Sequence, residues 1–169
     1  LAPQGSLCSR AIKNNSGEAR SQGLELETRY YATPNLLLSL SAGYTDTEFL
    51  DDGIGKKGDR LPMTPEWNGS LGLEYQFDLA GYDAFFRTDY SYRGEFFVDV
   101  GGSDTVTSIV DSYSQWNMRA GVAIDQFNIE VYGNNLANND AVTARWGFGG
   151  PLGFRMPPRV LGLDVSYNF

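Results

Sequence analysis

Residues 67–93 read WNGSLGLEYQFDLAGYDAFFRTDYSYR, and this stretch decides the fold. Across residues 67–77, apolar side chains at every second position alternate with small or polar ones, which is the period of a β-strand with two chemically different faces. Residues 78–81 interrupt the pattern with a short turn that contains glycine, and the alternation resumes across residues 84–93. The stretch therefore predicts an antiparallel hairpin with one apolar and one polar face.

The same alternation recurs from Gly23 to the end of the chain. It predicts strands at residues 24–31, 36–45, 67–77, 84–93, 115–124, 127–134 and 159–169. Short turns alternate strictly with long polar segments: the turns lie at residues 33–35, 78–81 and 125–126, and the long segments at residues 46–65, 94–111 and 137–157. This alternation is typical of outer-membrane barrels, with short periplasmic turns and long extracellular loops, whereas nothing imposes it on a soluble β-sandwich. The sequence therefore predicts an all-β, antiparallel transmembrane β-barrel.

The composition agrees with this fold class. The 169 residues include 20 Gly, 10 Tyr and 10 Phe, which is typical of β-rich chains with many turns. The formal net charge of −8 argues against a nucleic-acid partner, because such a partner requires a basic face. Mean hydropathy is −0.33, and no apolar run approaches the roughly 20 residues of a transmembrane helix. A barrel strand needs no such run, since only every second residue faces lipid.

The absence of histidine removes most enzymatic and metal-binding interpretations. Neither a Ser/His nor a Cys/His nucleophile pair can form, and the single cysteine, Cys8, leaves no internal disulfide and disfavours a soft-metal site. Residues 53–58 (GIGKKG) match the spacing of a dinucleotide-binding loop, but no helix pattern follows them. Asp51, Asp52 and Asp59 fit no calcium-loop spacing and are interpreted as hydrated loop residues. We therefore expect no enzymatic activity, no cofactor and no metal.

The two faces of the predicted strands have different expected surroundings. The apolar face is expected to contact lipid, at positions that include Leu38, Leu73, Phe86, Val122, Ile129 and Val165. Aromatic residues lie near the strand ends of this face, as interfacial girdles require, at Tyr30, Tyr44, Trp67, Phe77, Tyr92, Trp116 and Phe127. The opposite face carries Glu, Arg, Asp and Asn, which suits a hydrated or plugged lumen.

Four stretches together resemble one known family. Residues 17–27 (GEARSQGLELE), 58–67 (GDRLPMTPEW), 131–136 (VYGNNL) and 158–169 (PRVLGLDVSYNF) are similar, in order and spacing, to segments of TonB-dependent outer-membrane receptors. Each piece is loose by itself, and the resemblance extends over about residues 14–169.

The resemblance implies that the chain is the C-terminal part of a larger barrel. The family has a barrel of roughly 22 strands with a plug domain inside it, and this chain supplies about seven or eight of them. Residues 1–19 are then the end of a preceding strand and an extracellular loop, and residues 20–169 are the C-terminal strands. The plug and the earlier strands lie outside this chain. An alternative is a small self-contained barrel with a structural or adhesion role, closed by a strand at residues 7–14.

The resemblance also implies a function and partners. The expected function is active uptake of a scarce substrate, for which a ferric siderophore is the leading candidate, across the bacterial outer membrane, with energy supplied through the TonB complex and the absent plug. Lipid and lipopolysaccharide would surround the barrel, and the barrel-assembly machinery would recognise the last strand. That strand resembles the family's C-terminal assembly signal at Leu163, Val165, Tyr167 and Phe169.

Two groups of site residues follow from this resemblance. The first group faces the lumen, where its charges either form mutual ion pairs in water or hold the plug reversibly: Glu25, Glu27, Arg29, Glu74, Arg87, Asp89, Arg93, Arg119 and Glu130, with Asp164 on the same face. The second group lies in the last long loop, where aromatic and arginine side chains either pack locally or contact an anionic or aromatic substrate: Arg145, Trp146, Phe148 and Arg155.

Overall fold

The computed structural model describes residues 17–99, 109–146 and 152–169. Within these ranges the chain forms β-strands joined by turns and loops. The described residues contain no helix long and apolar enough to cross a membrane.

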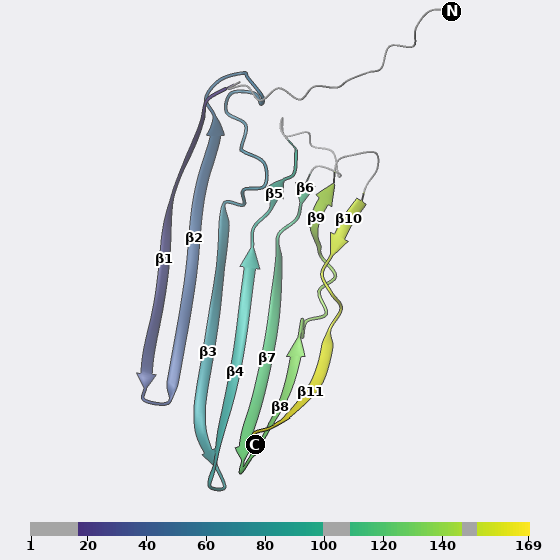
Figure 1. The fold of residues 1–169 in the computed structure, drawn as a ribbon. Coiled ribbons are helices and arrows are strands. Elements are labelled where there is room, and N and C mark those ends of the chain that lie inside the picture. Colours follow the sequence, from purple (N-terminus) through teal and green to yellow (C-terminus); the bar gives the residue numbers. More distant parts are fainter. Residues whose placement is uncertain (1–16, 100–108, 147–151) are drawn as a thin grey trace, which may run out of the picture.

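One antiparallel sheet of seven strands makes up most of the molecule (Figure 1). In chain order its strands are β1 (Ala19–Thr33), β2 (Leu36–Phe49), β3 (Trp67–Leu79), β4 (Tyr82–Arg93), β7 (Tyr113–Ile124), β8 (Phe127–Asn134) and β11 (Val160–Tyr167). Each strand pairs with the next in this order, so the sheet is a simple meander. The strand pairs β5 (Phe96–Phe97) with β6 (Ile109–Val110), and β9 (Val142–Trp146) with β10 (Leu152–Arg155), lie in the connections at one end.

Three tight turns gather at the opposite end, which we call the turn end; the end with the long connections is the loop end (Figure 1). The predicted turns near Pro34, Leu79 and Asp125 are confirmed. In the β3–β4 turn, Ala80 and Gly81 both have positive φ, at 57° and 92°, as expected for the type of two-residue turn that matches strand twist. The Gly81 amide also donates to Asp78 Oδ1 at 2.9 Å.

The register keeps like side chains on like faces across the whole sheet. On one face Leu38 lies opposite Leu73, and Val122 opposite Ile129. Large apolar side chains on this face are exposed; Leu163, for example, is 65% exposed. The other face carries the charged residues. Because a slip of one residue would exchange the faces of a strand, this pattern fixes the register.

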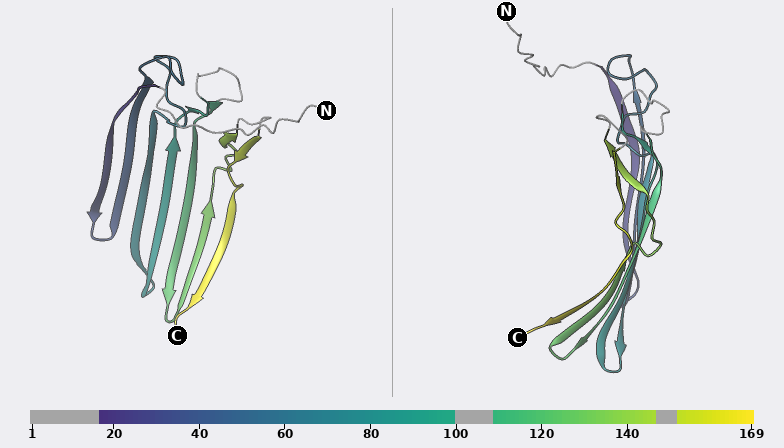
Figure 2. Two further views of the ribbon diagram at one scale, coloured as in Figure 1. Left: turned by 45° about the horizontal axis from the view of Figure 1, so that its top comes forward. Right: turned by 90° about the vertical axis from the view of Figure 1, so that its right-hand side faces the viewer.

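The seven-stranded sheet is a single curved layer that does not close (Figure 2). Among the described residues, β11 pairs with β8 alone and β1 with β2 alone. Within this part of the chain, the outer edges of β1 and β11 therefore have no neighbouring strand. Residues 7–14, the closing strand of the alternative interpretation, lie outside the described residues.

The long connections contain more structure than the sequence predicts. β2 continues to Phe49 instead of ending near residue 45, and Phe49 is buried, with its ring packed over Gly55. The segments expected to be polar loops contain β5 and β6 and the β9–β10 hairpin. Their small core includes Phe96 and Val110, which are 1% and 0% exposed. Two-residue strands show no period that a sequence pattern could reveal, so they were missed.

We predict that the apolar face contacts lipid in the full-length protein. Nitroxide labels at Leu38, Leu73, Phe86, Val122, Ile129 and Val165, each introduced as cysteine after replacement of Cys8 by serine, should be more accessible to oxygen than to a water-soluble nickel chelate. Oxygen partitions into hydrocarbon, so the apolar face should favour it. Labels at the polar-face positions Arg87 and Asn128 serve as controls, and the opposite pattern would invert the assignment of faces.

Candidate functional site

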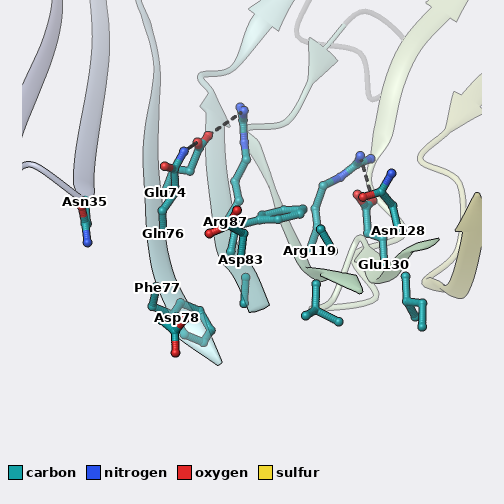
Figure 3. Close-up of a pocket in the computed structure, with 15 residues that line it drawn as sticks. Asn35, Glu74, Gln76, Phe77, Asp78, Asp83, Arg87, Arg119, Asn128 and Glu130 are labelled. Atoms are coloured by element: carbon teal, nitrogen blue, oxygen red, sulfur yellow. Dashed lines mark hydrogen bonds and ion pairs between the residues drawn. The ribbon is translucent and has the colours of Figure 1, made fainter. Parts of the chain in front are cut away.

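Charged side chains line a hollow on the polar face, close to the turn end (Figure 3). The hollow has a volume of about 900 Å³. Apart from Asn35 in the β1–β2 turn, its lining comes from β3, β4, β7 and β8 and includes Glu74, Gln76, Asp78, Asp83, Arg87, Arg119, Asn128 and Glu130. These strands are neighbours in the sheet, so the meander alone brings the residues together.

Ion pairs organise the charges of this hollow into two groups. Arg87 lies opposite Glu74 in the register and approaches it at 3.6 Å. Its Nε and Nη2 also donate to the two carboxylate oxygens of Asp89, at 2.8 and 2.9 Å. On the neighbouring strands, Arg119 pairs with Glu130 at 3.0 Å. We call these five residues the charge cluster.

The register also creates a conflict that the carboxylates resolve. Arg87 and Arg119 are direct cross-strand partners, an arrangement that is unfavourable for like charges. Each guanidinium is satisfied by acidic groups on the side away from the other: Glu74 on β3 for Arg87, and Glu130 on β8 for Arg119. The charge cluster therefore depends on its acidic members for its geometry.

The charge cluster stays accessible to water and to a partner surface. The side chains of Arg87 and Arg119 are 49% and 51% exposed, and that of Glu130 is 26% exposed. Exposed ion pairs contribute about 0–1 kcal/mol each to stability, because hydration and side-chain entropy offset most of their attraction. Such pairs can exchange partners at low cost, which is the property required of a surface that holds another domain reversibly.

The remaining predicted lumen residues do not join the charge cluster. Glu25, Glu27 and Arg29 lie on β1, at the edge of the sheet, with no ion pair among the described residues. Arg93 lies at the opposite end of β4, close to the loop end. Asp164 is the cross-strand partner of Glu130.

The predicted ligand contacts divide between the two strands of one hairpin. Arg145 on β9 lies opposite Gly153 on β10, and its Nε is buried with no hydrogen-bond partner among the described residues. Arg155 is engaged, since it donates to the carbonyl and a carboxylate oxygen of Asp140 at 2.9 and 3.1 Å. Trp146 is the last residue of β9, and Phe148 lies outside the described residues.

An asparagine network that the sequence analysis missed anchors this hairpin. The side chain of Asn135, which is 2% exposed, donates to the carbonyls of Asn139 and Pro157, both at 2.8 Å, and accepts from the Asn139 amide. Asn139 in turn donates to the Ser114 carbonyl at 3.0 Å. Asn135 has a φ of 50°, a conformation in which asparagine is enriched. Adjacent asparagines after a strand were an available clue.

Two of the three acidic loop residues considered for calcium accept local hydrogen bonds, whereas Asp59 Oδ2 is buried without a partner among the described residues. Asp51 accepts from the amides of Glu18 and Gly53, and Asp52 accepts from the amide of Lys57. Among the described residues no group of three or more His, Cys, Asp or Glu side chains is placed to hold a metal ion.

The sheet is a curved antiparallel layer with one apolar and one charged face, which is the architecture of a membrane barrel wall. Residues 2–136 match the family model described as TonB dependent receptor-like, beta-barrel. The chain belongs to this family, and the fold class predicted from the sequence is confirmed.

Solved structures show the same architecture. The ferric yersiniabactin uptake receptor FyuA from Yersinia pestis matches with a TM-score of 0.81 and 21% identity, over 92% of this chain and 24% of that one. The ferric citrate transporter FecA, in its unliganded form, matches with a TM-score of 0.72 and 22% identity, over 90% and 25%. BauA, the ferric preacinetobactin receptor from Acinetobacter baumannii, matches at 0.73 and 19%, over 91% and 23%. The chain thus spans about a quarter of the length of each.

We predict that Asn135→Ala loosens the loop end. The substitution leaves the carbonyls of Asn139 and Pro157 and the Asn139 amide, all in part-buried hydrogen bonds, without their partner, which should destabilise this region by about 1–3 kcal/mol. Limited proteolysis of the full-length protein in detergent should then cut residues 137–157 at least about tenfold faster. Asn128→Ala, an exposed asparagine without a hydrogen bond among the described residues, is the matched control. Equal cleavage of both variants would contradict the anchoring role.

Proposed function

We propose that the full-length protein is an outer-membrane receptor that imports a ferric siderophore with energy supplied through TonB. The observation that carries this proposal is the match to the receptor family. The sheet agrees with it, because one face exposes large apolar side chains and the other carries charged ones. Three solved relatives of the same fold are, by their names, a ferric yersiniabactin receptor, a ferric citrate transporter and a ferric preacinetobactin receptor. The chain itself would be the C-terminal part of the barrel.

The two ends of the sheet suggest its orientation in the outer membrane. Outer-membrane barrels have short turns on the periplasmic side and long loops outside. On that rule the turn end faces the periplasm, and the loop end, with Arg145, Trp146 and Arg155, faces the exterior, where a substrate arrives. The apolar face contacts lipid and lipopolysaccharide.

The charge cluster is the proposed contact for the plug domain. It lies in the periplasmic half of the lumen face, and its exposed ion pairs can re-form with charges of a plug after TonB has pulled that domain. Glu25, Glu27 and Arg29 are proposed to extend this contact along β1.

Uptake of iron in living cells tests the proposal. The full-length gene is expressed in a strain that lacks its own siderophore receptors, and cells are supplied with radioactive iron bound to a panel of siderophores and to citrate. We expect at least one chelate to be taken up, and uptake to fall to background when TonB is deleted. Uptake that persists without TonB would indicate a passive channel. The absence of any uptake would favour a structural or adhesion barrel.

We predict that deletion of Phe169 from the full-length protein reduces insertion into the outer membrane while synthesis stays unchanged. Phe169 is fully exposed in this chain and stacks edge-on against Tyr167, with ring centroids 5.2 Å apart, so it is available to the assembly machinery. Immunoblots of outer-membrane fractions measure insertion, and Asn168→Ala is the control. Normal insertion of the deletion variant would remove the proposed role of this residue in assembly.

A further inference from the structure

A second hollow lies on the polar face, nearer the loop end than the charge cluster. Its volume is about 450 Å³, and it is lined by Ser41, Pro65, Asn68, Gly69, Ser70, Tyr92 and Arg93. We call it the Arg93 pocket. Arg93 is six residues beyond Arg87 on β4, which corresponds to about 20 Å along the strand. The Arg93 pocket therefore lies between the charge cluster and the exterior loops.

The residues of the Arg93 pocket leave a space with an uncompensated positive charge. Gly43, Asn68 and Arg93 occupy one register row of β2, β3 and β4, and Ser41 and Ser70 are paired in the next row. The Asn68 amide lies over Gly43, where an added Cβ would come within 3.0 Å of its Oδ1. Small residues thus form the floor, and the Asn68 amide and the Ser41 and Ser70 hydroxyls line the same pocket as Arg93. Among the described residues, the lining contains no carboxylate.

Arg93 differs from the arginines whose charge is matched. Arg60, Arg87, Arg119 and Arg155 each pair with an acidic side chain. Arg93 makes no ion pair among the described residues, and its Nε is buried without a hydrogen-bond partner. The nearest acidic residue on its own face of β4, Asp89, is held by Arg87. A buried N–H left unpaired is unfavourable, and an anionic ligand that bonds to it would remove that cost.

The guanidinium of Arg93 is also held in place. It lies 4.5 Å from the ring centroid of Phe96, and Phe96 is 1% exposed in the small core of the loop end. Stacking on a fixed aromatic ring orients the planar fork and lowers the entropy lost when it binds.

We propose that the Arg93 pocket binds an anionic oxygen group, such as a carboxylate or a catecholate, of the imported molecule. The inference rests on the proposed function and adds a substrate class to it: a chelate with net negative charge. The Arg93 guanidinium forms a two-point, charge-assisted contact with the anion, and the Asn68 amide and the Ser41 and Ser70 hydroxyls supply further donors. The sequence analysis grouped Arg93 with the plug contacts. This proposal assigns it to the substrate instead.

Binding by the purified full-length receptor in detergent tests this assignment. The probes are ferric citrate and a ferric tris-catecholate, which are anionic, and a neutral ferric tris-hydroxamate, each titrated by quenching of tryptophan fluorescence. We expect at least one anionic probe to bind about tenfold or more tightly than the neutral one. Arg93→Gln should weaken anionic binding about 10- to 100-fold and leave neutral binding within about twofold. Arg93→Lys, which keeps the charge, should lose less.

Two further variants separate a local effect from a fold defect. Arg20→Gln removes the same charge from the opposite face, where Arg20 pairs with Glu48 at 3.0 Å, and should leave every affinity unchanged. Asn68→Ala keeps Arg93 in place and should weaken anionic binding about 3- to 10-fold by loss of one donor. Heat-modifiable migration in gels shows whether each variant retains the folded barrel.

The inference is overturned if the neutral probe binds more tightly than both anionic ones, if neither anionic probe binds, or if folded Arg93→Gln and Asn68→Ala both bind them as the wild type does. An unchanged affinity combined with faster proteolysis of the plug would return Arg93 to the plug contacts. These outcomes leave TonB-dependent uptake intact, whereas failure of the proposed function appears as uptake that is absent or independent of TonB.

Discussion

The pairing of backbone amides and carbonyls between adjacent strands is the constraint on which the rest of this structure depends. In hydrocarbon no water can replace a missing hydrogen bond, so every strand in a membrane must be paired along both edges. The ladder fixes one register, and that register places Leu38 beside Leu73 on one face and Glu74 beside Arg87 on the other. The same constraint applies to the outer edges of β1 and β11. In the described residues the backbone groups along these edges are unpaired, and in a closed barrel a neighbouring strand would pair with them.

The main sheet was predictable from the sequence because its determinants are local. Alternation with period two identifies a strand from its own residues, and a two-residue turn such as Ala80–Gly81 needs only the residues that adopt positive φ. The connections at the loop end depend on contacts between distant segments. Phe96 becomes a core residue by pairing with Val110, and Asn135 becomes an anchor because Asn139 and Pro157 return to it. No local period reports such contacts.

The charged face was predictable in composition but not in organisation. Alternation places Glu74, Arg87 and Arg119 on one face, yet it does not reveal that the two arginines are direct partners, because strand register is needed for that. Alternation also treats Arg93 as equivalent to Arg87, although their ion-pair and ring contacts differ. Arg87 pairs with two carboxylates, whereas Arg93 lies against a phenylalanine ring and pairs with no carboxylate in the described part of the chain. The difference arises from β5, which supplies Phe96 and is one of the elements the sequence pattern did not predict.

The contrast between paired and unpaired arginines suits two different tasks on one face. A hydrated ion pair loses one partner and gains another with little net change in free energy, so a surface built from such pairs can release and recapture a domain many times. An arginine fixed on an aromatic ring with an unmet N–H gains more from a new anion, because it has no carboxylate to give up. Under the proposed function, the periplasmic half of the wall would need ion pairs that exchange partners easily, and the exterior half would need an unpaired arginine that binds an anion. Strand β4 carries both kinds of arginine, the paired Arg87 and the unpaired Arg93. The short strand β5, which follows β4, supplies the Phe96 ring that holds the Arg93 guanidinium in place.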